Sequence, residues 1–151
     1  MEDRVHNDEV LYRCVFHDNP KNYTLEGGML RVKSSAFMDR SNQISVDRAK
    51  LCNNNPFHAQ KNPQDGVVML ITREIRGIDD LEYQGKDPIH YDLDVVPDPD
   101  LETNNMAHAL IIANPDIKND KVFRRLRRKL ELIANKHGWL IRPQGFRQLR
   151  N

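Results

Sequence analysis

Residues 88–115 read PIHYDLDVVPDPDLETNNMAHALIIANP, and this stretch decides how the rest of the chain is interpreted. In its first part apolar and polar residues alternate, which is the pattern of a strand with one buried face. The apolar positions are Ile89, Tyr91, Leu93 and Val95. Residues 107–112 are almost wholly apolar, as in a strand covered on both faces. The stretch therefore predicts two strands joined by an acidic, proline-containing loop.

Short apolar runs predict further strands at residues 10–16, 29–32, 44–46, 67–71 and 139–141. Residues 17–28 and 52–66 are rich in Asn and Pro and are expected to be loops. Asp47 is expected to cap a helical turn over residues 48–51. The first nine residues are polar, and we expect them to fray.

The most regular pattern in the chain predicts an amphipathic helix over residues 120–137. Asn119 or Asp120 can cap its start, and Gly138 lies where a left-handed C-terminal cap belongs. At helical spacing one face is apolar, through Val122, Phe123, Leu126, Leu130, Ile133 and Ala134.

Several short strands and one long helix, without β-α-β alternation, predict an α+β fold. We expect a mostly antiparallel sheet with the helix packed on one face. Residues 1–141 should form a single domain, and residues 142–151 a basic, mobile tail.

Composition narrows the functional classes. No apolar run approaches the roughly 18 residues of a membrane span, and the acidic N-terminus does not resemble a secretory signal. Two cysteines, Cys14 and Cys52, do not make a disulfide framework. We therefore expect a cytoplasmic protein without membrane contact. There is no Gly-rich phosphate loop, Cys-x-x-Cys pair or His-Glu-x-x-His motif, and no cofactor is expected.

Charge is divided sharply along the chain. Residues 1–120 hold 13 Lys and Arg against 21 Asp and Glu, whereas residues 121–151 hold 10 against Glu131 alone. The leading hypothesis is therefore a non-enzymatic binding module of a bacterial multi-component assembly, which contacts nucleic acid or an acidic protein through the basic helix. The expected anion-binding residues are Arg124, Arg125, Arg127, Arg128, Lys129, Arg142 and Arg147.

The acidic stretch, residues 79–102, offers two alternatives. It can dock on the basic helix within the chain, or it can be the face of a structural or immunity-type protein that binds a basic partner. Its His90, Asp92 and Asp94 share one strand face, but i to i+4 on a strand spans about 13 Å, too far for one ion. No metal site is expected there.

A second alternative is a small enzyme. Arg13 lies inside the first predicted strand, Ser34 follows the second, and His108 lies inside an apolar strand. The arginine with the Ser34-Ser35 pair resembles ADP-ribosyltransferase-like folds, in which an arginine and a serine strand hold NAD and a glutamate assists transfer. That resemblance implies roles for Arg13 and Ser34, with Glu74 or Glu82 as the glutamate. The enzyme alternative adds His108, so its cleft is built from Arg13, Ser34 and His108.

The segments VKSSAFMDRSNQISVDRAKL and VVPDPDLETNNMAHALI, with the arginine-containing first strand, also resemble a family of small uncharacterised bacterial proteins. In that family a Ser-Ser segment with Ala-Phe, a Ser-Val segment, a Pro-Asp-Pro turn and a His-Ala pair recur in this order. The resemblance spans residues 11–112 and implies no activity.

Overall fold

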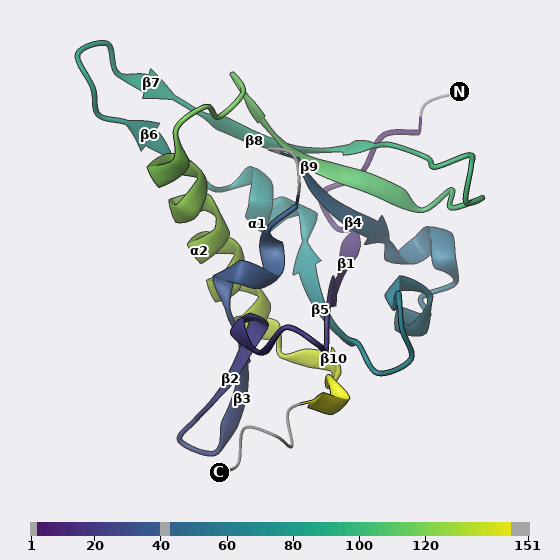
Figure 1. The fold of residues 1–151 in the computed structure, drawn as a ribbon. Coiled ribbons are helices and arrows are strands. Elements are labelled where there is room, and N and C mark those ends of the chain that lie inside the picture. Colours follow the sequence, from purple (N-terminus) through teal and green to yellow (C-terminus); the bar gives the residue numbers. More distant parts are fainter. Residues whose placement is uncertain (1–2, 40–42, 146–151) are drawn as a thin grey trace.

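The computed structural model describes residues 3–39 and 43–145 and confirms the predicted α+β class (Figure 1). Six strands form one antiparallel sheet in the order β10-β5-β1-β4-β9-β8. In that order they are Trp139–Ile141, Gly66–Ile71, Val10–Val15, Ile44–Arg48, His108–Asn114 and Asp92–Pro97. Two hairpins project from opposite ends of the molecule, β2 (Tyr23–Glu26) with β3 (Met29–Val32) and β6 (Glu82–Tyr83) with β7 (Ile89–His90).

The helices cover the two faces of this sheet unequally. One face carries α2 (Asp120–His137), α1 (Thr72–Arg76) and the 3₁₀ turn η2 (Ser34–Phe37). The other face carries only the 3₁₀ turns η3 (Ala49–Cys52) and η4 (Pro56–Ala59). A further 3₁₀ turn, η1 (Pro20–Asn22), leads into β2. We refer to the two sides as the α2 face and the η face.

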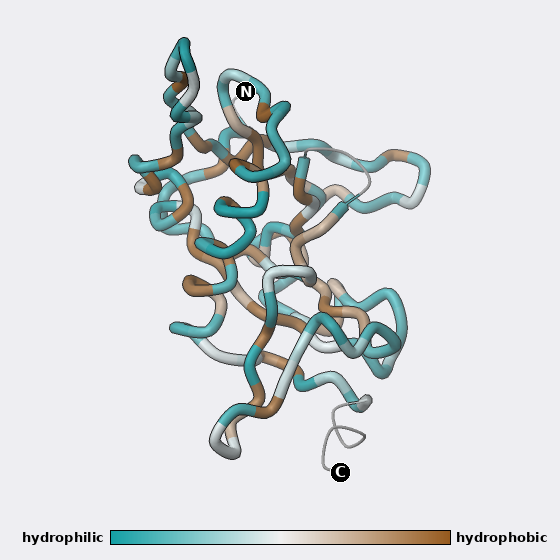
Figure 2. Tube along the Cα trace, turned by 60° about the vertical axis from the view of Figure 1, so that its left-hand side comes forward, coloured by the Kyte–Doolittle hydropathy of each residue, from teal (hydrophilic) through white to brown (hydrophobic). Residues whose placement is uncertain are grey.

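The main core lies between the sheet and α2. Alternate strand residues such as Leu11, Leu70 and Ile111 meet Leu126 and Leu130 of the helix, and each is at most 2% exposed. A smaller apolar cluster lies on the η face, around Tyr12, Ala49, Cys52, Ala59, Val67 and Ala107. In Figure 2 apolar segments gather in the interior of the molecule, while most of the outer loops are hydrophilic.

Helix α2 has the predicted bounds. The Asn119 side-chain oxygen accepts hydrogen bonds from the N–H groups of Lys121 and Val122, at 2.9 and 3.2 Å. These bonds satisfy two of the free donors at the helix start. At the other end Gly138 has φ of 83°, a conformation that only glycine adopts without strain.

Three local predictions are wrong. Residues 3–9 are not frayed, because Val5 is fully buried and the Arg76 guanidinium donates to its carbonyl oxygen at 2.7 Å. Residues 23–26 form strand β2 and not a loop, since Gly27 and Gly28, at φ of 57° and 82°, close a tight hairpin with β3. Asp47 does not cap a helical turn, because Arg48 occupies the N-cap position of η3.

The first part of the predicted tail packs on the domain. Pro143 is buried, and the backbone N–H of Gln144 donates to the carbonyl oxygen of Gln64 at 2.9 Å. Residues 146–151, including Arg147, lie outside the described residues. Within residues 3–39 and 43–145, no helix has the length and apolar character needed to cross a membrane.

Candidate functional site: a basic helix face and a polar cavity

The cations of α2 divide into two groups by what they contact. The first group faces α1 and the start of the acidic stretch, and we call it the inner flank. Arg125 donates to the carbonyl oxygen of Glu82, and Lys136 pairs with the carboxylate of Glu74. Lys129 lies between them, with its Nζ 2.7 Å from Asp80 Oδ1. The inner flank is therefore engaged by the protein itself.

The second group lies on the adjacent side of the helix, which is turned away from the buried apolar stripe, and we call it the outer face. It consists of Lys121, Arg124 and Arg128, all exposed and spaced three or four residues apart, so that they fall on neighbouring turns. Within the described part of the chain none of the three side chains makes a hydrogen bond or ion pair. Arg127 borders them, with its guanidinium carbon 5.0 Å from the Phe123 ring centre. Burial, together with the charge of Arg124, lowers the pKa of Arg127.

The rest of the acidic stretch does not reach the outer face. Asp92 lies 3.2 Å from His90, Asp94 lies 2.8 Å from Arg76, and Asp98 lies 3.2 Å from His108. Among the described residues, the polar contacts between the acidic stretch and the basic helix are those of Asp80 and the Glu82 backbone. Arg142 is exposed and also has no partner among the described residues.

A cavity of about 310 Å³ opens on the η face of the sheet. The floor of this cavity is formed by residues of three paired strands. Tyr12 of β1 lies opposite Asp47 of β4, and Asp47 lies opposite His108 of β9. Directly opposed residues point to the same side of a sheet, so these three side chains form a row across three neighbouring strands. All three line the cavity.

Asp47 differs from every other buried charged residue of the described chain because it has no ion-pair partner there. Glu9 and Arg48 pair with each other, Arg13 pairs with Asp39, and Asp65 pairs with His17. The remaining one, Asp47, is 6% exposed and has no cationic partner among the described residues. Its Oδ1 accepts one hydrogen bond, from the Asn105 amide at 2.9 Å. A buried carboxylate normally has a counter-charge, because removing it from water is costly.

The contacts of His108 fix its tautomer when it is neutral. Its Nδ1 lies 2.8 Å from the carbonyl oxygen of Asp98 and 3.2 Å from the Oδ2 of the same residue. A carbonyl oxygen only accepts, so Nδ1 must carry the hydrogen and Nε2 must present a lone pair. His108 is therefore not sealed in apolar packing, although its strand is apolar in sequence.

Arg13 also lines this cavity, but its guanidinium is already engaged. Strands β1 and β4 pair only at Leu11 and Tyr12. Beyond Tyr12 the two strands are no longer paired, and the Arg13 side chain bridges the gap between them. It donates to the carbonyl oxygens of Ala36 and Ser45 at 3.0 and 2.8 Å, and forms two 3.0 Å bonds with Asp39. These contacts use four of its five N–H donors.

The other residues of the predicted enzyme cleft lie elsewhere. Ser34 is in η2 and is not among the residues that line the cavity. Glu74 pairs with Lys136 and His137 beneath α2, and Glu82 lies beside His90. Of the three residues predicted to share a cleft, the structure brings Arg13 and His108 to one cavity and leaves Ser34 outside it.

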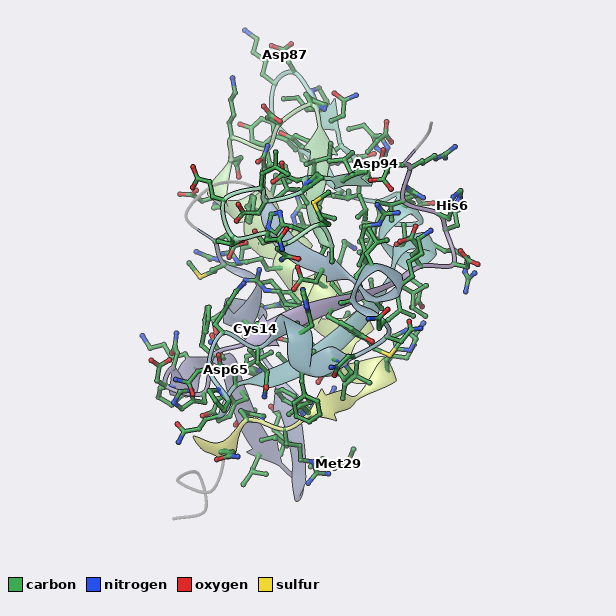
Figure 3. The ribbon with its side chains drawn as sticks, turned by 90° about the vertical axis from the view of Figure 1, so that its right-hand side faces the viewer. His6, Cys14, Met29, Asp65, Asp87 and Asp94 are labelled. Carbon is green, nitrogen blue, oxygen red and sulfur yellow. The ribbon has the colours of Figure 1, made fainter. Side chains whose placement is uncertain are left out.

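Sequence reasoning missed a second polar network. Asp65, only 1% exposed, lies 2.7 Å from His17 Nδ1 and accepts from the Cys14 thiol at 3.4 Å (Figure 3). Burial raises the pKa of Cys14 to about 12, and the charge of Asp65 adds to this rise. The three residues are separated by up to 51 positions, so no local pattern could reveal the network.

No group of three or more His, Cys, Asp or Glu side chains in the described ranges could hold a metal ion. In the comparisons with known proteins, no family model, curated protein or solved structure matches this chain.

Proposed function

We propose that this protein is a non-enzymatic binding module that holds an anionic partner, with nucleic acid as the first candidate, on the outer face of α2. The observation that carries the proposal is the contrast between the two sides of the helix. Lys121, Arg124 and Arg128 have no partner within the described chain, whereas Lys129 and Lys136 are paired with acids. Unpaired cations on one rigid element form a surface to which phosphates can bind.

The fold supports this role mechanically. The apolar side of α2 is anchored by Leu126 and Leu130, which are nearly or fully buried, and its start is capped by Asn119. The backbone positions of the outer face are therefore fixed before binding, so that only its side chains have to be ordered, which limits the entropic cost of association.

The test is a salt titration of binding to labelled duplex DNA and single-stranded RNA, with polyglutamate as an acidic polymer. Binding should strengthen as salt falls, because phosphate contacts release counterions. The double variant R124A/R128A should weaken binding and reduce the slope of log K against log salt by roughly 1 to 2. Tighter binding of nucleic acid than of polyglutamate would identify the partner class.

The matched control is K129A/K136A, which removes the same amount of charge from the same helix but from the inner flank. It should weaken binding much less than R124A/R128A. Equal weakening by both double variants would show a response to net charge alone and would refute the proposed surface. Absence of binding to all three polymers at low salt would also refute it.

A further inference from the structure

The cavity on the η face is independent of α2, and its floor carries three groups whose hydrogen-bonding capacity is not used. We propose that this cavity is a binding site for a primary ammonium group, held by Asp47, Tyr12 and His108.

Asp47 supplies the charge. Its Oδ1 accepts from Asn105, and its Oδ2 has no partner among the described residues. Every side-chain nitrogen or oxygen sealed from solvent in the described chain does have a partner. The Oδ2 atom must therefore be open to solvent, and Asp47 lines this cavity.

Tyr12 is a second, independent observation. Its side chain lines the cavity, is 5% exposed, and has a hydroxyl that makes no hydrogen bond to any described residue. By the same argument this hydroxyl is open to solvent, on a side chain that lines the cavity. Buried tyrosine hydroxyls normally have a partner, so an unpartnered one at the floor of a polar cavity points to a ligand.

The third acceptor is His108. Because Nδ1 donates to the Asp98 carbonyl oxygen, the neutral ring presents Nε2, which has no partner among the described residues, as an acceptor. An ammonium group has three N–H donors, and the row Tyr12–Asp47–His108 offers three acceptors.

The free acceptors also distinguish ammonium from guanidinium. An arginine-like group binds a carboxylate best through two parallel bonds to both oxygens. At Asp47 the Asn105 amide already uses one lone pair of Oδ1, so a fork of this kind would have to share that oxygen with Asn105. A group that needs one carboxylate oxygen and two neutral acceptors fits the site better.

The remaining charges of the cavity favour a cation. The guanidinium of Arg13 and the carboxylate of Asp39 neutralise each other, and Asp100 adds a further negative charge. Lys61, exposed and without a partner in the described chain, is the one opposing charge among the described residues that line the cavity. Its removal should therefore tighten the binding of a cation.

Two sources could supply the ammonium group: a free small amine, or a lysine side chain of another protein. The test is titration of the full-length protein, by calorimetry and by amide chemical-shift mapping, with butylammonium, with 1-butanol and with an acetylated Gly-Lys-Gly peptide. Butylammonium should bind and 1-butanol should not. Tighter binding of butylammonium than of the peptide assigns the site to a free amine, and the reverse assigns it to a lysine side chain.

Asp47→Asn should weaken ammonium binding by at least about tenfold, because it removes the one charge that contacts the group. Asp92→Asn is the matched control, since Asp92 is an exposed acid outside the cavity, and it should leave binding unchanged. Tyr12→Phe should weaken binding less than Asp47→Asn, and Lys61→Ala should strengthen it.

Tyr12→Phe also keeps the test decisive if Asp47→Asn fails to fold. Equal binding of butylammonium and 1-butanol would overturn the proposal. An ammonium affinity that is unchanged in Asp47→Asn would also overturn it. If Asp47→Asn is unfolded, an unchanged ammonium affinity in Tyr12→Phe would do so instead. Failure of every amine to bind in the millimolar range would do the same. None of these outcomes depends on the basic helix, so they are separate from the test of nucleic-acid binding.

Discussion

The Arg48 guanidinium holds the Glu9 carboxylate through two hydrogen bonds of 2.9 and 3.0 Å, although the two residues are 39 positions apart. Neither residue is more than 5% exposed. A further contact of 3.0 Å joins Arg48 to Asp3. Strand β4 thus holds the N-terminal segment against the domain through a buried ion pair.

Replacing Arg48 by Met should destabilise the fold, because it leaves the Glu9 carboxylate buried without its main partner. We expect a loss of about 3 kcal/mol in the free energy of unfolding, measured by urea denaturation. Lys50→Ala is the control, since that lysine is half exposed beside Glu9 and should contribute less than about 1 kcal/mol. The double variant E9L/R48M should recover most of the stability, since the charges that it leaves unpaired, on Asp3 and Lys50, are exposed to water. Equal effects of R48M and K50A would contradict this account.

Three buried or half-buried carboxylates predict the acid sensitivity of the protein. Burial by itself raises the pKa values of Glu9, Asp39 and Asp65. Hydrogen bonds outweigh this effect, from Arg48 to Glu9, from Arg13 to Asp39 and from His17 to Asp65. The pKa values are therefore lowered, from 4.5 for Glu9 and from 3.8 for the two aspartates. In the folded state these groups bind protons less tightly than in the unfolded state. Their contribution to stability is therefore complete at neutral pH and is lost as the pH falls below about 4.

The variant Asp39→Asn tests whether the charge of Asp39 stabilises the fold at neutral pH and ceases to do so in acid. Its difference from the wild type in unfolding free energy should be greatest near neutral pH and should shrink as the pH falls into the acid range. Urea denaturation at a series of pH values gives the comparison. A difference that stays constant across this range would mean that the charge of Asp39 is not the stabilising feature.

Helix α2 should depend on its N-cap. Replacing Asn119 by Ala removes the acceptor for two backbone N–H groups and should cost about 1 kcal/mol in unfolding free energy. Asn119→Asp keeps an acceptor at the same place and should cost less. If the proposed function is correct, the loss in N119A should appear in thermal or urea unfolding without a change in the salt slope of binding.

The two thiols should be unreactive in the folded protein. Burial is the main cause that raises the pKa of Cys14 to about 12 and that of Cys52 to about 11. Little thiolate is then present at pH 8, and the thiolate is the form that reacts. Disulfide-exchange reagents should modify the native protein far more slowly than the urea-unfolded chain. Rapid reaction of C52S, whose remaining thiol is Cys14, would contradict the raised pKa of that thiol.

The elements that sequence predicted correctly are those whose signal is local. The alternation around Leu93 and the helical period from Val122 to Ala134 each follow from neighbouring residues, and both appear in the structure. Strand β2 was missed because its Asn- and Pro-rich approach resembles a loop, although the pair Gly27-Gly28 is itself a hairpin signal.

The site residues were harder to predict because they depend on register. Asp47 precedes a short helical turn and therefore resembles a cap in sequence, yet its side chain contacts Asn105, which is 58 residues away. The row of Tyr12, Asp47 and His108 exists only because β1, β4 and β9 pair in one particular register. Nothing near Arg13 in the sequence indicates that it fills a gap between two strands.

The outer strands of the sheet have one more consequence. Strand β10 is only three residues long and is soon followed by Pro143, which cannot donate a ladder hydrogen bond. Strand β8, at the opposite side, carries the exposed charges of Asp92 and Asp94 and ends at Pro97. Neither border is suited to pairing with a strand of another molecule. The six-stranded sheet is therefore protected at both borders against edge-to-edge pairing with a second copy of the chain.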